Sequence, residues 1–249
     1  MNKLTFDFEI GGQQHHLRMI FVEGTGTGAY WFGEDGKRQP IRISDFFIAD
    51  IQTTQALWKY IMGEDANPAA FKGDDMPAEH VSWLDITKDG GFLTIINNSD
   101  IITFIKTQLP AGANPVFRLP SETEWEYAAR GGKHWRDEFI FSGSNSLDEV
   151  AWYLNNSGRH TWPVAQKKAN QLELYDMCGN LWEWCEDVFI RDTSQIPKDG
   201  APFLTTGKDR VLRGGCHHNM AVHCTIFKRY EIAPDSFDEC IGFRVALSF

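Results

Sequence analysis

The chain has 249 residues, of which 42% are hydrophobic, including nine Trp and 18 Phe, and its formal net charge at pH 7 is −10. This apolar content can fill a sizeable core, which excludes a disordered or fibrous chain. The negative charge argues against nucleic-acid binding, because a duplex binder needs Lys and Arg on the phosphates. No apolar run could span a bilayer and no signal-peptide pattern opens the chain, so we expect a cytoplasmic protein without membrane contact.

The cysteine pattern argues against both a disulfide framework and a structural zinc site. The five Cys are an odd number at irregular spacings, and none forms a Cys-x-x-Cys pair. Cys178 and Cys185 are therefore expected to be packing residues. We expect free thiols in a reducing compartment.

In the first half of the chain, predicted short strands are followed by predicted short helices. Residues 3–50 alternate polar and apolar positions in runs separated by Gly, which predicts short antiparallel strands. Thr54 is positioned to cap a helix over 55–62, and Ser82 has capping spacing to Asp85. A turn and a strand are predicted at 89–96.

Two further helices are predicted before helical periodicity ends near Asn145. Residues 100–109 carry apolar side chains at helical intervals and end at Pro110. Ser121 and Glu124 have the spacing of a capping box, which predicts a helix within 120–132. From Asn145 onward Trp, Gly, Asn and Asp accumulate without helical periodicity, so we expect long ordered loops. Without repeats or linkers, residues 1–249 are predicted to form one α+β domain.

Three sequence blocks together resemble the formylglycine-generating enzyme, or sulfatase-modifying factor, family. They are 118–132, the Leu-Tyr-Asp-Met-Cys-Gly-Asn-Leu-Trp-Glu-Trp block beginning at Leu174, and the Arg-Gly-Gly of 213–215 with the Gly-Phe-Arg of 242–244. The resemblance implies a variant of the C-type-lectin fold with small antiparallel sheets, two to four helices and little other regular structure.

The family's copper chemistry would require two cysteines, and only one of them is present here. In catalytic members two Cys after the Gly-Gly pair bind copper(I) and oxidise a substrate Cys of a sulfatase to formylglycine. Cys224 falls on the second of these positions, but Asn219 falls on the first, and Asn cannot replace a thiolate as a copper(I) ligand. A rearranged copper site with catalytic Cys224 and Cys216 is one alternative. The other is that Cys224 is a small buried hydrophobe.

Three histidines lie near these cysteines. His217 and His218 would point to opposite faces of an extended segment, so at most one of them is expected to join His223 at a common centre. The remaining histidines are expected to lie on a surface loop.

The resemblance also implies a structural calcium ion held by the block that begins at Leu174. The expected ligands are the carboxylates of Asp176 and Glu183 with the carbonyls of Gly179 and Leu181. In the alternative, Glu183 pairs with an Arg such as Arg213 or Arg244.

The departures from the family pattern are concentrated between Cys216 and Cys240, while the flanking blocks remain. This distribution resembles the variable proteins of diversity-generating retroelements, which display a variable C-terminal surface on the same scaffold. We therefore predict a non-catalytic ligand-binding protein whose residues 216–239 face a protein or peptide, with the copper-dependent oxidase as the alternative. The predicted ligand-binding residues are Cys216, His217, His218, Asn219, Met220, His223, Ile226, Phe227, Tyr230 and Phe237.

Overall fold

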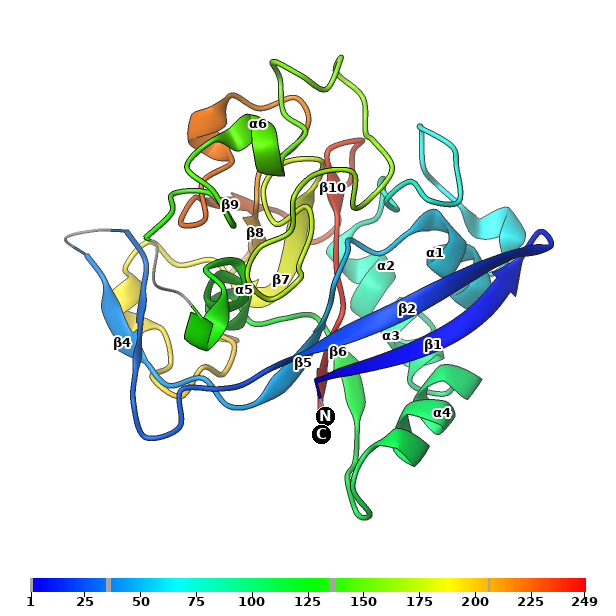
Figure 1. Cartoon of the computed structure of the whole chain (residues 1–249), viewed down its shortest axis with the longest axis horizontal. Coiled ribbons are helices and arrows are strands. Elements are labelled where there is room, and N and C mark those ends of the chain that lie inside the picture. The colour runs from blue at the N-terminus through cyan, green and yellow to red at the C-terminus, as the bar shows by residue number, and fades with distance from the viewer. Residues whose placement is uncertain (1, 35–36, 135–137, 206) are drawn as a thin grey trace.

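The structure is a computed structural model that describes residues 2–34, 37–134, 138–205 and 207–249. Two β-sheets and a two-stranded hairpin are joined by short helices and long loops (Figure 1). This is the α+β arrangement that the sequence predicts. None of the helices in these described ranges is long and apolar enough to cross a membrane.

A five-stranded antiparallel sheet separates two hydrophobic cores. Successive residues of its strands point to opposite faces, so Phe47 packs in one core and Phe46 and Ile48 pack in the other. Every residue of the central strand is therefore buried. The strands, in their order across the sheet, are β1 (Lys3–Ile10), β2 (Gln13–Val22), β5 (Phe46–Ala49), β11 (Ala246–Ser248) and β6 (Val116–Arg118).

Four helices cover the first core. The Thr54 cap of α1 is confirmed, and Ser82 and Asp85 form the predicted capping box of α2. The ranges are α1 (Gln55–Met62), α2 (Trp83–Thr87), α3 (Phe92–Ile96) and α4 (Asp100–Gln108), with a 3₁₀ turn η1 (Glu64–Ala66) after α1.

The strand predicted at residues 92–96 is wrong, because this segment forms α3. Phe92 and Ile96 are four residues apart and both are fully buried, which places them on one helical face. The Phe92 ring stacks on Trp58 at 5.5 Å between centroids. Tertiary packing of these two positions therefore outweighs the β propensity of Thr94 and Ile95.

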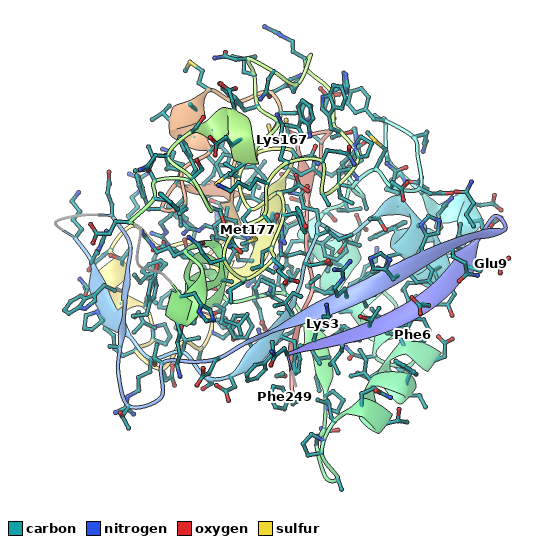
Figure 2. All side chains as sticks on the ribbon, in the orientation of Figure 1. Lys3, Phe6, Glu9, Lys167, Met177 and Phe249 are labelled. Carbon is teal, nitrogen blue, oxygen red and sulfur yellow. The ribbon has the colours of Figure 1, made fainter. Side chains whose placement is uncertain are left out.

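The second core lies on the other face of the sheet. Helix α5 (Glu122–Ala129) begins at the predicted Ser121–Glu124 capping box, and all of its residues are buried. Met177, labelled near the centre of Figure 2, belongs to this core. The hairpin strands β3 (Tyr30–Phe32) and β4 (Gln39–Ile41) contribute to it, while η2 (Gly132–His134) and α6 (Leu147–Val150) follow α5 in the chain.

The second sheet consists of strands from the second half of the chain and carries the predicted ligand-binding segment, residues 216–239. Residues 151–181, all described, form no helix or strand, which agrees with the predicted ordered loops. Strand β10 pairs in parallel with β7, whereas β7, β8 and β9 pair antiparallel. The elements are β7 (Trp182–Val188), η3 (Thr193–Gln195), β8 (Arg210–Arg213), η4 (Ala221–His223), β9 (Arg229–Ile232) and β10 (Ile241–Gly242).

Candidate functional site

Strand β8 leads into the Cys- and His-containing segment, and a buried guanidinium at its end fixes that segment. The Arg213 side chain is fully buried, and its Nη2 donates to the Glu126 carboxylate on α5. The same guanidinium donates to the carbonyl oxygens of Ile226, Phe227 and Lys228 at 2.8–3.1 Å. One side chain therefore holds the loop before β9 against the core.

Glu126 is a buried anion that is compensated by several donors. Tyr30 donates its hydroxyl to Glu126 at 2.6 Å, and Arg130 donates to the same carboxylate at 3.2 Å. Burial alone would raise the pKa of Glu126, but the charges of Arg213 and Arg130 hold this pKa below its usual value. The carboxylate is therefore charged and structural.

A second buried ion pair fixes the other end of the segment. Arg244 donates from Nε and Nη2 to the two oxygens of Glu183, both at 2.7 Å, and both side chains are fully buried. Trp125 Nε1 at 2.7 Å and Gln52 Nε2 at 3.0 Å also donate to this carboxylate. The alternative in which Glu183 pairs with an Arg is confirmed, and the partner is Arg244.

The predicted calcium ligands face N–H donors in this arrangement. Both oxygens of Glu183 are engaged by N–H groups, and Gln52 Nε2 also donates to the Leu181 carbonyl at 3.0 Å. One oxygen of Asp176 accepts a backbone N–H, the other is buried without a partner, and burial raises its pKa to about 6. Gly179 lies in the same loop with φ 75°. As arranged, these residues do not fit a calcium ion, because N–H donors already occupy the Glu183 oxygens.

Residues 216–219 form a turn, which brings two histidines together. The Asn219 side chain accepts the Cys216 N–H at 3.1 Å, and the Asn219 N–H donates to the Cys216 carbonyl at 2.9 Å. The His217 and His218 rings lie 4.4 Å apart between centroids. Because the backbone here is a turn, the divergence expected for an extended segment does not apply, and neither ring shares a metal-ligating group with His223 among the described residues.

His217 is fully buried and has one free ring nitrogen. Its backbone N–H and its Nδ1 both contact the carbonyl oxygen of Asn180 at 3.0 Å, so Nδ1 carries the proton. Its Nε2 is buried without a partner, and burial lowers the pKa of the ring. A neutral imidazole with an open lone pair results. One ligand atom each from His217, Cys216 and Cys240 lie within 4.8 Å of one another.

Cys224 lies in a different environment from Cys216. Its thiol is fully buried in the second core with Cys178, and burial raises its pKa. The thiol also packs against Gly215, where an added Cβ would lie 2.7 Å from the sulfur. Cys216 packs in the first core. Among the described residues, two groups of three could ligate a metal, Cys216–His217–Cys240 and His217–His218–Glu239, and neither contains Cys224. The Cys216–Cys224 centre of the oxidase alternative stays a prediction.

The predicted ligand-binding residues differ widely in exposure. Met220 (58%), Tyr230 (50%) and Phe237 (59%) are exposed, whereas His218, Asn219, His223 and Phe227 are half-buried. Cys216, His217 and Ile226 are buried, so their predicted place on the surface is wrong: the turn and Arg213 draw them into the interior. The sequence interpretation missed Val222 (61% exposed), which lies in η4 two residues before the buried Cys224.

The comparisons with known proteins identify the family. Residues 9–249 match the sulfatase-modifying factor enzyme 1-like domain. The chain belongs to this FGE-sulfatase family. The chaperone protein LppX of Paenibacillus barcinonensis is 38% identical over 204 residues, or 67% of this chain and 70% of that protein. The formylglycine-generating enzyme of Bos taurus is 30% identical over 259 residues, or 91% of this chain and 61% of the enzyme.

Solved structures of FGE-sulfatase-like chains share the fold. Treponema denticola variable protein 1 matches with a TM-score of 0.76 at 27% identity, with 98% of both chains covered. PvdO from Pseudomonas aeruginosa matches with a TM-score of 0.72 at 20% identity over 93% of this chain and 94% of that one. The expected C-type-lectin-like fold and the resemblance to variable proteins are therefore confirmed.

The structure gives Asn219 a role at the position where catalytic members of the FGE-sulfatase family have their first Cys. Its side chain closes the turn that presents Cys216 and His217. Sequence spacing did not reveal that Cys240, distant in the chain, lies beside this turn. The available signal was its position two residues before the Gly-Phe-Arg block, which β10 carries back to β7.

Proposed function

We propose that this FGE-sulfatase chain is a binding protein that recognises a protein or peptide through the exposed part of residues 216–239. The observation that carries the proposal is the exposure of four large apolar side chains in this segment: Met220, Val222, Tyr230 and Phe237. Met and aromatic side chains supply contact area and adaptable packing at interfaces. The net charge of −10 adds no support for a nucleic-acid partner.

The way the segment is anchored supports a recognition role. Arg213 fixes the backbone at 226–228 from the interior, and after the segment β10 pairs with β7 while Arg244 is bound to Glu183 on that strand. Exposed positions between such anchors can change without loss of the fold. Figure 1 shows η4 (orange) near α6, at the end of the molecule away from the marked termini. The likeness to a protein named a variable protein agrees with this arrangement.

The contacts of Asn219 and Cys224 favour binding over the oxidase alternative. Asn219 Oδ1 is occupied by a backbone N–H, and an amide is a poor copper(I) ligand. Cys224 is fully buried in the second core and belongs to neither of the two metal-ligating groups found among the described residues.

A peptide-library selection tests the proposed surface. Peptides selected on the wild-type chain should bind at least about tenfold more weakly to a Tyr230→Ser/Phe237→Ser variant, since truncating exposed aromatic contacts at an interface costs more than about 1 kcal/mol each. The matched control is Trp31→Ser, which removes another exposed aromatic (52%) outside the segment. Peptides whose Kd changes equally in both variants would count against the proposal.

The oxidase alternative has its own assay. Copper(I) is titrated anaerobically, and oxygen uptake is followed with a Cys-x-Pro-x-Arg peptide. We expect no aldehyde product. Aldehyde formation that Cys224→Ala abolishes would replace the binding function with the family's oxidation reaction.

A further inference from the structure

We propose that Cys216, His217 and Cys240 form a zinc(II) site beside the exposed segment. One ligand atom from each of the three lies within 4.8 Å of the others. Two thiolates and one imidazole form a ligand set that zinc uses in proteins, with the fourth position left to a water or a carboxylate. The site does not include Cys224 or Asn219, and it does not depend on the proposed binding function.

The His217 ring is oriented with one nitrogen free to bind a metal. Its Nδ1 is engaged by the Asn180 carbonyl at 3.0 Å, and its buried Nε2 has no hydrogen-bond partner. Metal-bound histidines commonly use their second nitrogen in this way, because the outer hydrogen bond fixes both the tautomer and the ring orientation. Asn180 is itself fixed by two side-chain hydrogen bonds to the Trp162 backbone at 3.0 Å. A metal ion would satisfy the orphaned nitrogen, for which the described residues offer no other partner.

The two thiols come from separate parts of the chain and meet at this point. Cys216 follows β8 in the turn closed by Asn219, and Cys240 precedes β10, which pairs with β7. The Cys240 thiol hydrogen bonds to Cys216, and all five cysteines are free. Zinc binding through two thiolates would therefore release the protons of both thiols.

Two further ligand groups, His218 and Glu239, lie beside His217 and are partly exposed to solvent. The His218 side chain is 34% exposed and that of Glu239 is 39% exposed, with His218 Nδ1 3.6 Å from Glu239 Oε1. One ligand atom of each lies within 4.8 Å of one on His217. The two thiolates already neutralise Zn²⁺, and the Glu239 carboxylate lies where it could take the fourth position.

Metal titration of the full chain tests the site. The protein is reduced, stripped with a chelator and titrated anaerobically with Co²⁺ and then with Zn²⁺ in competition with a chromophoric chelator. We expect one metal per chain and a cobalt spectrum with thiolate charge-transfer and tetrahedral d–d bands. Cys240→Ser should weaken zinc binding at least about 100-fold, the upper end of the loss seen when only an outer-shell partner is removed.

The matched control is Cys178→Ala, which removes a buried thiol from the second core. It should leave the zinc affinity unchanged, and circular dichroism of both variants verifies the fold. Three results would overturn the proposal: zinc binding that survives Cys240→Ser, a folded wild-type chain that takes up no zinc, and a site that accepts copper(I) but refuses zinc. A Cys216–Cys240 disulfide in protein purified under reductant would also exclude it.

Discussion

Removal of the Arg244 guanidinium tests the buried framework most directly. Arg244 supplies two of the four N–H donors to Glu183 and also donates to the Ala49 and Tyr175 carbonyls at 3.1 and 2.8 Å. Arg244→Met would leave a fully buried carboxylate with only the neutral donors of Trp125 and Gln52. Breaking one partner of such a pair costs about 3–5 kcal/mol.

The assay is urea unfolding followed by fluorescence of the nine Trp residues. Arg191→Met is the control, because Arg191 is 90% exposed and its pair with Glu231 is long, at 3.7 Å. This control should change the free energy of unfolding by less than about 0.5 kcal/mol. The double variant Glu183→Gln/Arg244→Met should lose less than the sum of its single variants, since the buried charge is gone. A loss below about 1 kcal/mol for Arg244→Met would refute the reasoning.

Three further predictions address the cation, the pH dependence and the surface. Calcium or EDTA should leave the Tm unchanged, because Glu183 is already neutralised by Arg244; a Tm raised by calcium in differential scanning calorimetry would show the opposite. The pKa of Asp176 is about 6 in the folded chain, which is above the value for an unfolded Asp. The protonated carboxyl therefore stabilises the fold below about pH 4. This stabilisation, up to roughly 3 kcal/mol, is lost as the pH rises through 6. Chemical unfolding at pH 4 and pH 7 should show that Asp176→Asn removes this decline, and an unchanged decline would assign it elsewhere. Tyr230→Ser and Phe237→Ser should each shift the free energy of unfolding by about 0.5 kcal/mol or less, as exposed side chains do, and a larger loss would mean that they belong to the core.

Local capping chemistry made several elements predictable from the sequence. The Ser82 and Ser121 capping boxes and the Thr54 cap depend on residues within three positions of each other, so the printed sequence contains the whole signal. Residues 92–96 were predicted wrongly because five residues, four of them apolar, are too short to show a clear period. The helical state of this segment depends on Trp58, which lies far away in the sequence.

The candidate sites were less predictable because they depend on contacts between distant residues. Glu126 was not singled out, although it neutralises Arg213 from 87 positions away in the chain. The grouping of Cys216 with Cys240 likewise follows from the pairing of β10 with β7. Residue spacing cannot show which of several cysteines lie close together in the folded chain.

The adjacency of Cys216 and Cys240 has a consequence for the exposed residues between them. The segment starts and finishes at one place on the molecule, and between its ends it is also held by the pairing of β9 with β8 and by the Arg213 hydrogen bonds to 226–228. Bringing together the ends of a flexible stretch of about 25 residues costs on the order of 3 kcal/mol of chain entropy. Folding offsets this cost through the β8–β9 pairing, the Arg213 hydrogen bonds and the burial of Cys224 and Ile226, none of which uses the side chains of Met220 or Phe237. Substitutions at the exposed positions Met220 and Phe237 should therefore leave the contacts that close the segment unchanged.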